Sequence, residues 1–169
     1  MSDLDTLAKA GIAAINEGDF GLAIDKFRAA LELEPDRPDI NSALGMAYLH
    51  RGQVYDAIPK LLRAHNLAAD IDDPEAEAMK LHFATSLATA YELSEQVNKA
   101  IDVLKGTIKL WPNQLEPRVQ LGQLQLSSCL LNEGVDTYKE LAALDGLDEG
   151  RREAALAVVG SIDEFLRLD

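Results

Sequence analysis

The clearest pattern of hydrophobic and polar positions in the chain lies between Gly18 and Pro35. Ala23, Phe27 and Ala30 are spaced about one helical turn apart, so they share one face of a helix. Small residues on either side of a phenyl ring let a neighbouring helix approach closely while the ring fills the gap. Because glycine and proline are typical helix ends, the pattern predicts one amphipathic helix between Gly18 and Pro35.

The same arrangement returns 34 residues further along the chain, at Gly52, Ala57, Leu61 and Ala64. An internal repeat of this period indicates stacked helical hairpins rather than a globular fold with one centre. Pro59 lies early in the second helix of this repeat, where a missing N–H group does least damage. We therefore expect no break in that helix.

An insertion of nine residues, 72–80, interrupts the register before the third repeat. Asp73 followed by Pro74 is typical of a helix N-cap and first helical residue, so we expect the insertion to lengthen the next helix by about two turns. The pattern then returns from Leu81 and, more weakly, from Leu115. The turns of these later repeats lack the glycine that the first two contain.

These positions resemble the tetratricopeptide repeat family. Its unit has a small residue in the first helix, two alanines flanking an aromatic residue in the second, and a closing proline. The first unit matches at Gly11, Ala23, Phe27, Ala30 and Pro35. The resemblance implies an all-α fold, a right-handed α-solenoid of about four helical hairpins with a C-terminal capping helix. The expected units are residues 4–37, 38–71, 81–114 and 115–148.

Residues 149–169 are expected to form the capping helix. Their apolar stripe consists of Ala155, Val158, Val159, Ile162 and Phe165 or Leu166. Such a helix would cover the open end of the stack. It could also supply a contact for a homo-oligomer.

Composition narrows the possible functions. The chain is 47% hydrophobic and only 5% aromatic, which suits closely packed helices. Its formal net charge of −13 argues against nucleic acid and anionic membranes as partners. Two explanations of the acidity stay open, solubility and recognition of a basic partner.

Cys129 is the single cysteine, and the sequence begins with acidic residues rather than a signal peptide. We therefore expect a cytoplasmic protein. The three histidines show no metal-ligand spacing, and no nucleotide-binding glycine loop is present. The sequence predicts no catalytic residues, no cofactor and no metal, so an enzyme is not expected.

The resemblance also implies a binding site. In the family, the first helix of each unit lines a concave groove. Carried over to this chain, the groove positions mix apolar side chains with neutral hydrogen-bonding groups, which suits an extended peptide or a single helix with apolar anchors. The positions that correspond to the groove are Ala8, Ile12, Asn16, Ser42, Met46, His50, His82, Thr85, Thr89, Val119 and Gln123.

One subclass of the family grips the C-terminal carboxylate of chaperones with a clamp of lysine, asparagine and arginine side chains. The corresponding residues here are Ala8, Ile12, Ala43, His82 and Ser86. None of them replaces the clamp at neutral pH, so the sequence argues against that ligand.

The sequence thus favours a non-catalytic scaffold or adaptor that binds a protein or peptide partner. Two alternatives stay open: a small acidic chaperone of the kind that holds secretion substrates, and the interaction arm of a longer enzyme.

Overall fold

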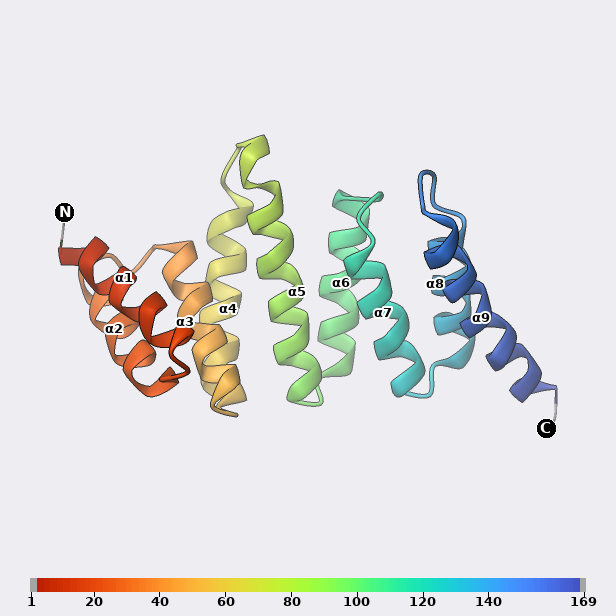
Figure 1. The fold of residues 1–169 in the computed structure, drawn as a ribbon, viewed down its shortest axis with the longest axis horizontal. Coiled ribbons are helices and arrows are strands. Elements are labelled where there is room, and N and C mark those ends of the chain that lie inside the picture. The colour runs from red at the N-terminus through yellow and green to blue at the C-terminus, as the bar shows by residue number, and fades with distance from the viewer. Residues whose placement is uncertain (1–2, 168–169) are drawn as a thin grey trace. The chain divides into compact units, whose positions relative to one another are not determined.

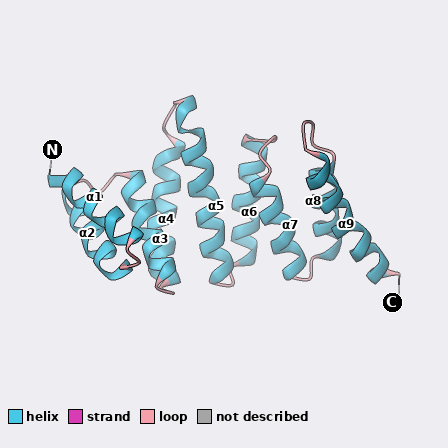
Figure 2. Cartoon of the chain, viewed as in Figure 1, coloured by secondary structure: helices cyan, strands magenta, loops and turns pink. Residues whose placement is uncertain are grey.

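The computed structural model describes residues 3–167, apart from the side chain of Pro74. These residues form α-helices, one 3-10 turn and the connections between them, with no strand among them (Figure 2). The prediction of an all-α fold is therefore confirmed. Residues 168 and 169 of the expected capping helix lie outside the described residues.

The chain divides into two compact units, Met1–Gln96 and Val97–Asp169 (Figure 1). The first unit contains α1 (Asp3–Asn16), α2 (Phe20–Leu33), α3 (Pro38–His50), α4 (Val54–Ala69), the 3-10 turn η1 (Pro74–Ala76) and α5 (Glu77–Leu93). The second contains α6 (Val97–Leu110), α7 (Glu116–Ser127), α8 (Leu131–Ala142) and α9 (Glu149–Leu166).

In the first unit, α1 pairs with α2 and α3 pairs with α4 as helical hairpins. The first helices of successive repeats also touch, because α3 contacts both α1 and α5. In the second unit, α7 pairs with α8, while α6 packs on α7 and α9 packs on α8. The boundary between the units falls between α5 and α6, within the third repeat expected from the sequence.

A glycine on the first helix sets the packing distance in three hairpins. A Cβ atom on Gly11 would lie 2.5 Å from Cε1 of Phe27, and one on Gly45 would lie 2.6 Å from Cγ of Leu61. Gly122 and Tyr138 show the same relation, with a closest approach of 2.7 Å. The large side chain of the second helix therefore rests directly on the backbone of the first.

The inserted residues adopt two conformations, the 3-10 turn η1 and the first turn of the α-helix α5. Asp73 accepts a hydrogen bond from the N–H of Glu75 through its side chain, at 2.9 Å, and so caps η1 rather than the α-helix. Residues 77–80 form the first turn of α5, whose N-cap, Ala76, provides no side-chain hydrogen bond. The α4 helix continues from Val54 to Ala69 through Pro59, as expected.

The α9 helix covers one face of α8. Ala155 and Val159 are buried in a cluster with side chains of α8, and Val158 and Ile162 pack against that cluster. The expected stripe does not extend to the end of the helix, because Phe165 and Leu166 are 55% and 40% exposed. By that point α9 has run past the side chains of α8 that form the cluster.

Candidate protein-binding face

The first helices of the first unit form the surface that corresponds to the predicted groove. We call the surface of α1, α3 and α5 the first-helix face. Its members lie at intervals of three or four residues along each helix, so each helix contributes one ridge. From α1 these are Ala8, Ile12 and Asn16; from α3, Ser42, Met46 and His50; from α5, His82, Thr85 and Thr89.

Exposure separates the members of the first-helix face into three groups, exposed, half-buried and buried. Ile12 is 53% exposed, and Asn16, His50 and His82 are also exposed, whereas Ala8, Met46 and Thr89 are half-buried. Ile12 and Met46 occupy the same repeat position on neighbouring helices. They therefore provide a pair of apolar contacts that a partner could cover.

Two predicted members are buried between the helices instead. Ser42 is 2% exposed and Thr85 is 6% exposed. Thr85 donates its hydroxyl proton to backbone carbonyl oxygens of its own helix, at Leu81 and His82, both at 3.1 Å. The hydroxyl of Ser42 is buried without a hydrogen-bond partner. In this conformation these two residues support the face rather than offer contacts on it.

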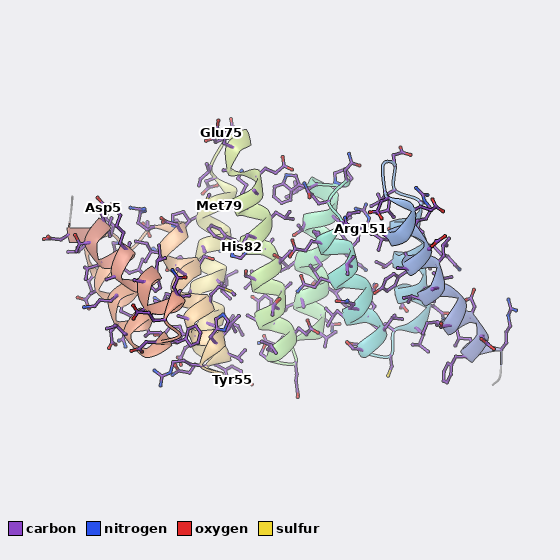
Figure 3. All side chains as sticks on the ribbon, viewed as in Figure 1. Asp5, Tyr55, Glu75, Met79, His82 and Arg151 are labelled. Atoms are coloured by element: carbon purple, nitrogen blue, oxygen red, sulfur yellow. The ribbon has the colours of Figure 1, made fainter. Side chains whose placement is uncertain are left out.

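His50 is held by a neighbour that the sequence did not indicate. Its ring stacks on Phe20, the first residue of α2, with ring centroids 4.5 Å apart and planes at 6°. The stack connects the end of α3 to the start of α2. His82 is exposed on α5 (Figure 3).

Two carboxylates near the first-helix face, Asp39 and Glu92, have different surroundings. Asp39 accepts two hydrogen bonds from Arg37, at 3.1 Å from Nε and 2.7 Å from Nη2. This hydrogen bonding raises the pKa of Arg37 above its ordinary value. Glu92, near the end of α5, is exposed.

The predicted members in the second unit lie on α7. Val119 is half-buried and packs against the cluster between α8 and α9, while Gln123 is exposed. Whether they extend the binding surface of the first unit stays a prediction.

Within residues 3–167, no group of three or more His, Cys, Asp or Glu side chains is arranged to hold a metal ion. No helix in the same range combines the length and the apolar character that a membrane span requires.

Comparison with known proteins supports the fold. Residues 14–81 match a family model described as Tetratricopeptide repeat. No curated protein matches the sequence.

Three solved structures illustrate the likeness. One is a protein of Podosopora anserina, described as a kinesin light chain with nearly identical TPR-like repeats. It is 18% identical to this chain, with a TM-score of 0.74, and the match covers 95% of this chain and 85% of that chain. MamA is 19% identical, with a TM-score of 0.72, over 96% and 91%. The first TPR domain of Spaghetti (RPAP3), bound to the HSP90 peptide SRMEEVD, is 16% identical, with a TM-score of 0.64, over 75% and 94%.

Proposed function

This chain belongs to the tetratricopeptide repeat family, and from that premise we propose that it is an adaptor that holds a segment of a partner protein on its first-helix face. The fold is one of protein-interaction modules, and one similar structure holds a peptide. The partner segment would be an extended peptide or a single helix.

The observation that carries this proposal is the pair Ile12 and Met46. A large aliphatic side chain that is 53% exposed, as Ile12 is, gains from being covered. Covering its remaining surface would contribute about 1 kcal/mol. The flexible thioether of Met46 can adapt its shape to a partner at the adjacent position. Two such contacts side by side suit a ligand with apolar anchors.

The ligand would differ from the acidic peptide held by Spaghetti. The residues that correspond to the carboxylate clamp include Ala8, Ile12 and Ser86, none of which is basic, and Ser86 is only 7% exposed. A carboxylate would therefore find no positive partner at these positions and would lose its water on binding.

The test compares two variants in a pull-down from a lysate of the source organism. Ile12→Ser combined with Met46→Ser removes the apolar contacts without adding charge. Leu33→Ser is the matched control, because Leu33 is 54% exposed and lies on α2. We expect the double variant to lose proteins that the wild type and Leu33→Ser both retain. Identical proteins on all three samples would refute the assignment of this face.

A chaperone function is the second candidate, and the net charge of −13 supports it. A dedicated chaperone keeps one client soluble, so deletion of this protein should move that client into the insoluble fraction. An adaptor predicts no such change. In either case we propose a cytoplasmic location, which cell fractionation would check.

Self-association through α9 is a separate proposal. Leu156 and Phe165 are 50% and 55% exposed on this helix. If they pair two copies, Leu156→Ser with Phe165→Ser should reduce the mass measured by light scattering to that of a monomer. A monomeric wild type at high concentration would contradict this proposal.

A further inference from the structure

Negative charge is concentrated on the first helices of the first unit. The α1, α3 and α5 helices together carry five carboxylates and two lysines, namely Asp3, Asp5, Asp39, Glu77 and Glu92 with Lys9 and Lys80. The α2 and α4 helices carry three carboxylates and four cations, namely Asp25, Glu32 and Asp56 with Lys26, Arg28, Lys60 and Arg63. The helices that form the first-helix face are therefore acidic, whereas the helices behind them are not.

Most of these carboxylates have a structural role. Asp3, Asp5, Asp39 and Glu77 lie in the first turns of their helices, where they complement the positive end of the helix dipole. Glu92 is different, because it lies in the last turn of α5, next to the negative end. A carboxylate in this place destabilises a helix slightly, so stability of the fold does not explain it.

The surroundings of Glu92 strengthen the negative potential. The C-terminal ends of α1, α3 and α5 lie at one edge of the first unit (Figure 1). The last turns of α1 and α5 contain no basic residue, and that of α3 contains only His50. Glu17 and Glu95 are exposed in the turns that follow α1 and α5. We call this region the acidic edge.

Arg51 lies close to the acidic edge. It directly follows α3, but its Nη1 atom approaches the start of α2, 3.6 Å from where a Cβ of Gly21 would lie. Its guanidinium therefore lies beside the turn that joins α1 to α2, where Glu17 is also exposed. Glu17, Glu92 and Glu95 outnumber this cation, and such an excess of carboxylates favours a cation supplied by a ligand.

We propose that the first-helix face selects a basic amphipathic segment of its partner protein. Its apolar side chains would cover Ile12 and Met46, and a lysine or arginine would lie at the acidic edge beside Glu92. This inference rests on the proposed function, because it uses the same face, and it adds the charge of the ligand.

The test uses two probe peptides of about 18 residues, long enough to span the face as a helix. Both carry the same leucine and methionine positions at helical spacing, and their polar positions are lysine in one and glutamate in the other. Affinity for the full chain is measured by fluorescence anisotropy in about 50 mM salt, where exposed charges are weakly screened. We expect the lysine peptide to bind at least about tenfold more tightly than the glutamate peptide.

Charge removal at two matched places separates a local effect from general attraction to an acidic protein. Glu92→Gln should weaken the lysine peptide about two- to fivefold, the range of an exposed ion pair, and should not weaken the glutamate peptide. Glu32→Gln removes the same charge from the last turn of α2 and should change the affinity by less than about twofold. Melting temperature gives an independent control, since Glu92→Gln should keep or raise it.

Each contrary result has one meaning. If both peptides bind equally, or if Glu32→Gln acts like Glu92→Gln, the preference for a basic segment is overturned. In that case, loss of binding in the Ile12→Ser, Met46→Ser variant would still support the proposed face. If this double variant binds both peptides like the wild type, or if neither peptide binds the wild type, the face itself is not the site and both proposals fail.

Discussion

Replacing Cys129 by glycine should stabilise the fold, because the backbone at this residue has a conformation that favours glycine. Cys129 has a φ angle of 60°, close to the 71° of Gly52 in the second repeat. The hydrogen bonds also correspond. Cys129 donates its N–H to the carbonyl of Leu126 at 3.1 Å, and Leu130 donates to Gln125 at 2.8 Å. This pattern closes a helix with a left-handed residue, where a Cβ atom is unfavourable.

The magnitude follows from two opposing terms. A non-glycine residue in the left-handed region costs about 1–2 kcal/mol, which the substitution removes. Glycine also increases the conformational entropy of the unfolded chain, which lowers the free energy of unfolding by about 0.4–1 kcal/mol. Because Cys129 is exposed, loss of its side chain should matter little. The net gain should be about 1 kcal/mol, or a rise in melting temperature of about 2–4 °C.

Urea denaturation followed by circular dichroism would measure the change. Cys129→Ala is the matched control, since it removes the thiol but keeps the Cβ atom and should give no gain. Gly52→Ala should lose about 1 kcal/mol, and through the backbone alone, because no atom lies within 4 Å of the added Cβ. The explanation would be refuted if Cys129→Ala stabilised the fold as much as Cys129→Gly.

Three further predictions concern packing, a buried hydrogen bond and pH. Gly45→Ala should destabilise the fold by about 2 kcal/mol in urea denaturation, because the new Cβ would lie 2.6 Å from Cγ of Leu61. Gly106→Ala is the control, and it should be neutral or stabilising because there is open space around Gly106. Thr137→Val should cost about 1–3 kcal/mol by removing the donor 2.7 Å from Oε1 of buried Gln125, and adding Gln125→Met should recover part of the loss. Burial lowers the pKa of His65, so the unfolded chain binds a proton at this residue more readily than the folded chain does. Stability should therefore fall as the pH drops below about 6.5. His65→Gln should flatten this decline in melting temperature, and an unchanged slope would exclude His65 as its cause.

The helical hairpins could be predicted from the sequence because their packing depends on residue size at fixed spacing. Gly11 against Phe27 and Gly45 against Leu61 are contacts between positions 16 residues apart, which a repeat makes visible. Accessibility on the first-helix face was harder to predict. Ser42 is buried, whereas Ala8 at the same repeat position is half-buried, because exposure depends on tertiary neighbours that the repeat pattern does not record.

Side chains with local hydrogen-bonding roles were also missed. Asn41 donates its Nδ2 proton to the carbonyl oxygens of Pro35 and Arg37, both at 2.9 Å, and so holds the connection before α3. Arg118 holds the connection before α7 in the same way, because its Nη1 donates to the carbonyl oxygens of Pro112 and Gln114. The repeat pattern records the size and spacing of residues, so it gave no indication of these hydrogen bonds.

The corresponding residue of α9, Arg152, makes a related contact. Its Nη1 donates to the carbonyl oxygen of Ala142 at 2.7 Å, and its Nη2 lies 3.4 Å from those of Leu144 and Leu147. Arg152 therefore fixes the connection between α8 and α9 from the first turn of the later helix, as Asn41 does for α3. The α9 helix therefore begins with the same kind of contact as α3 and α7, which are the first helices of their hairpins. With this start fixed, one side of α9 packs on α8 through Ala155 and Val159, while Leu156 is 50% exposed.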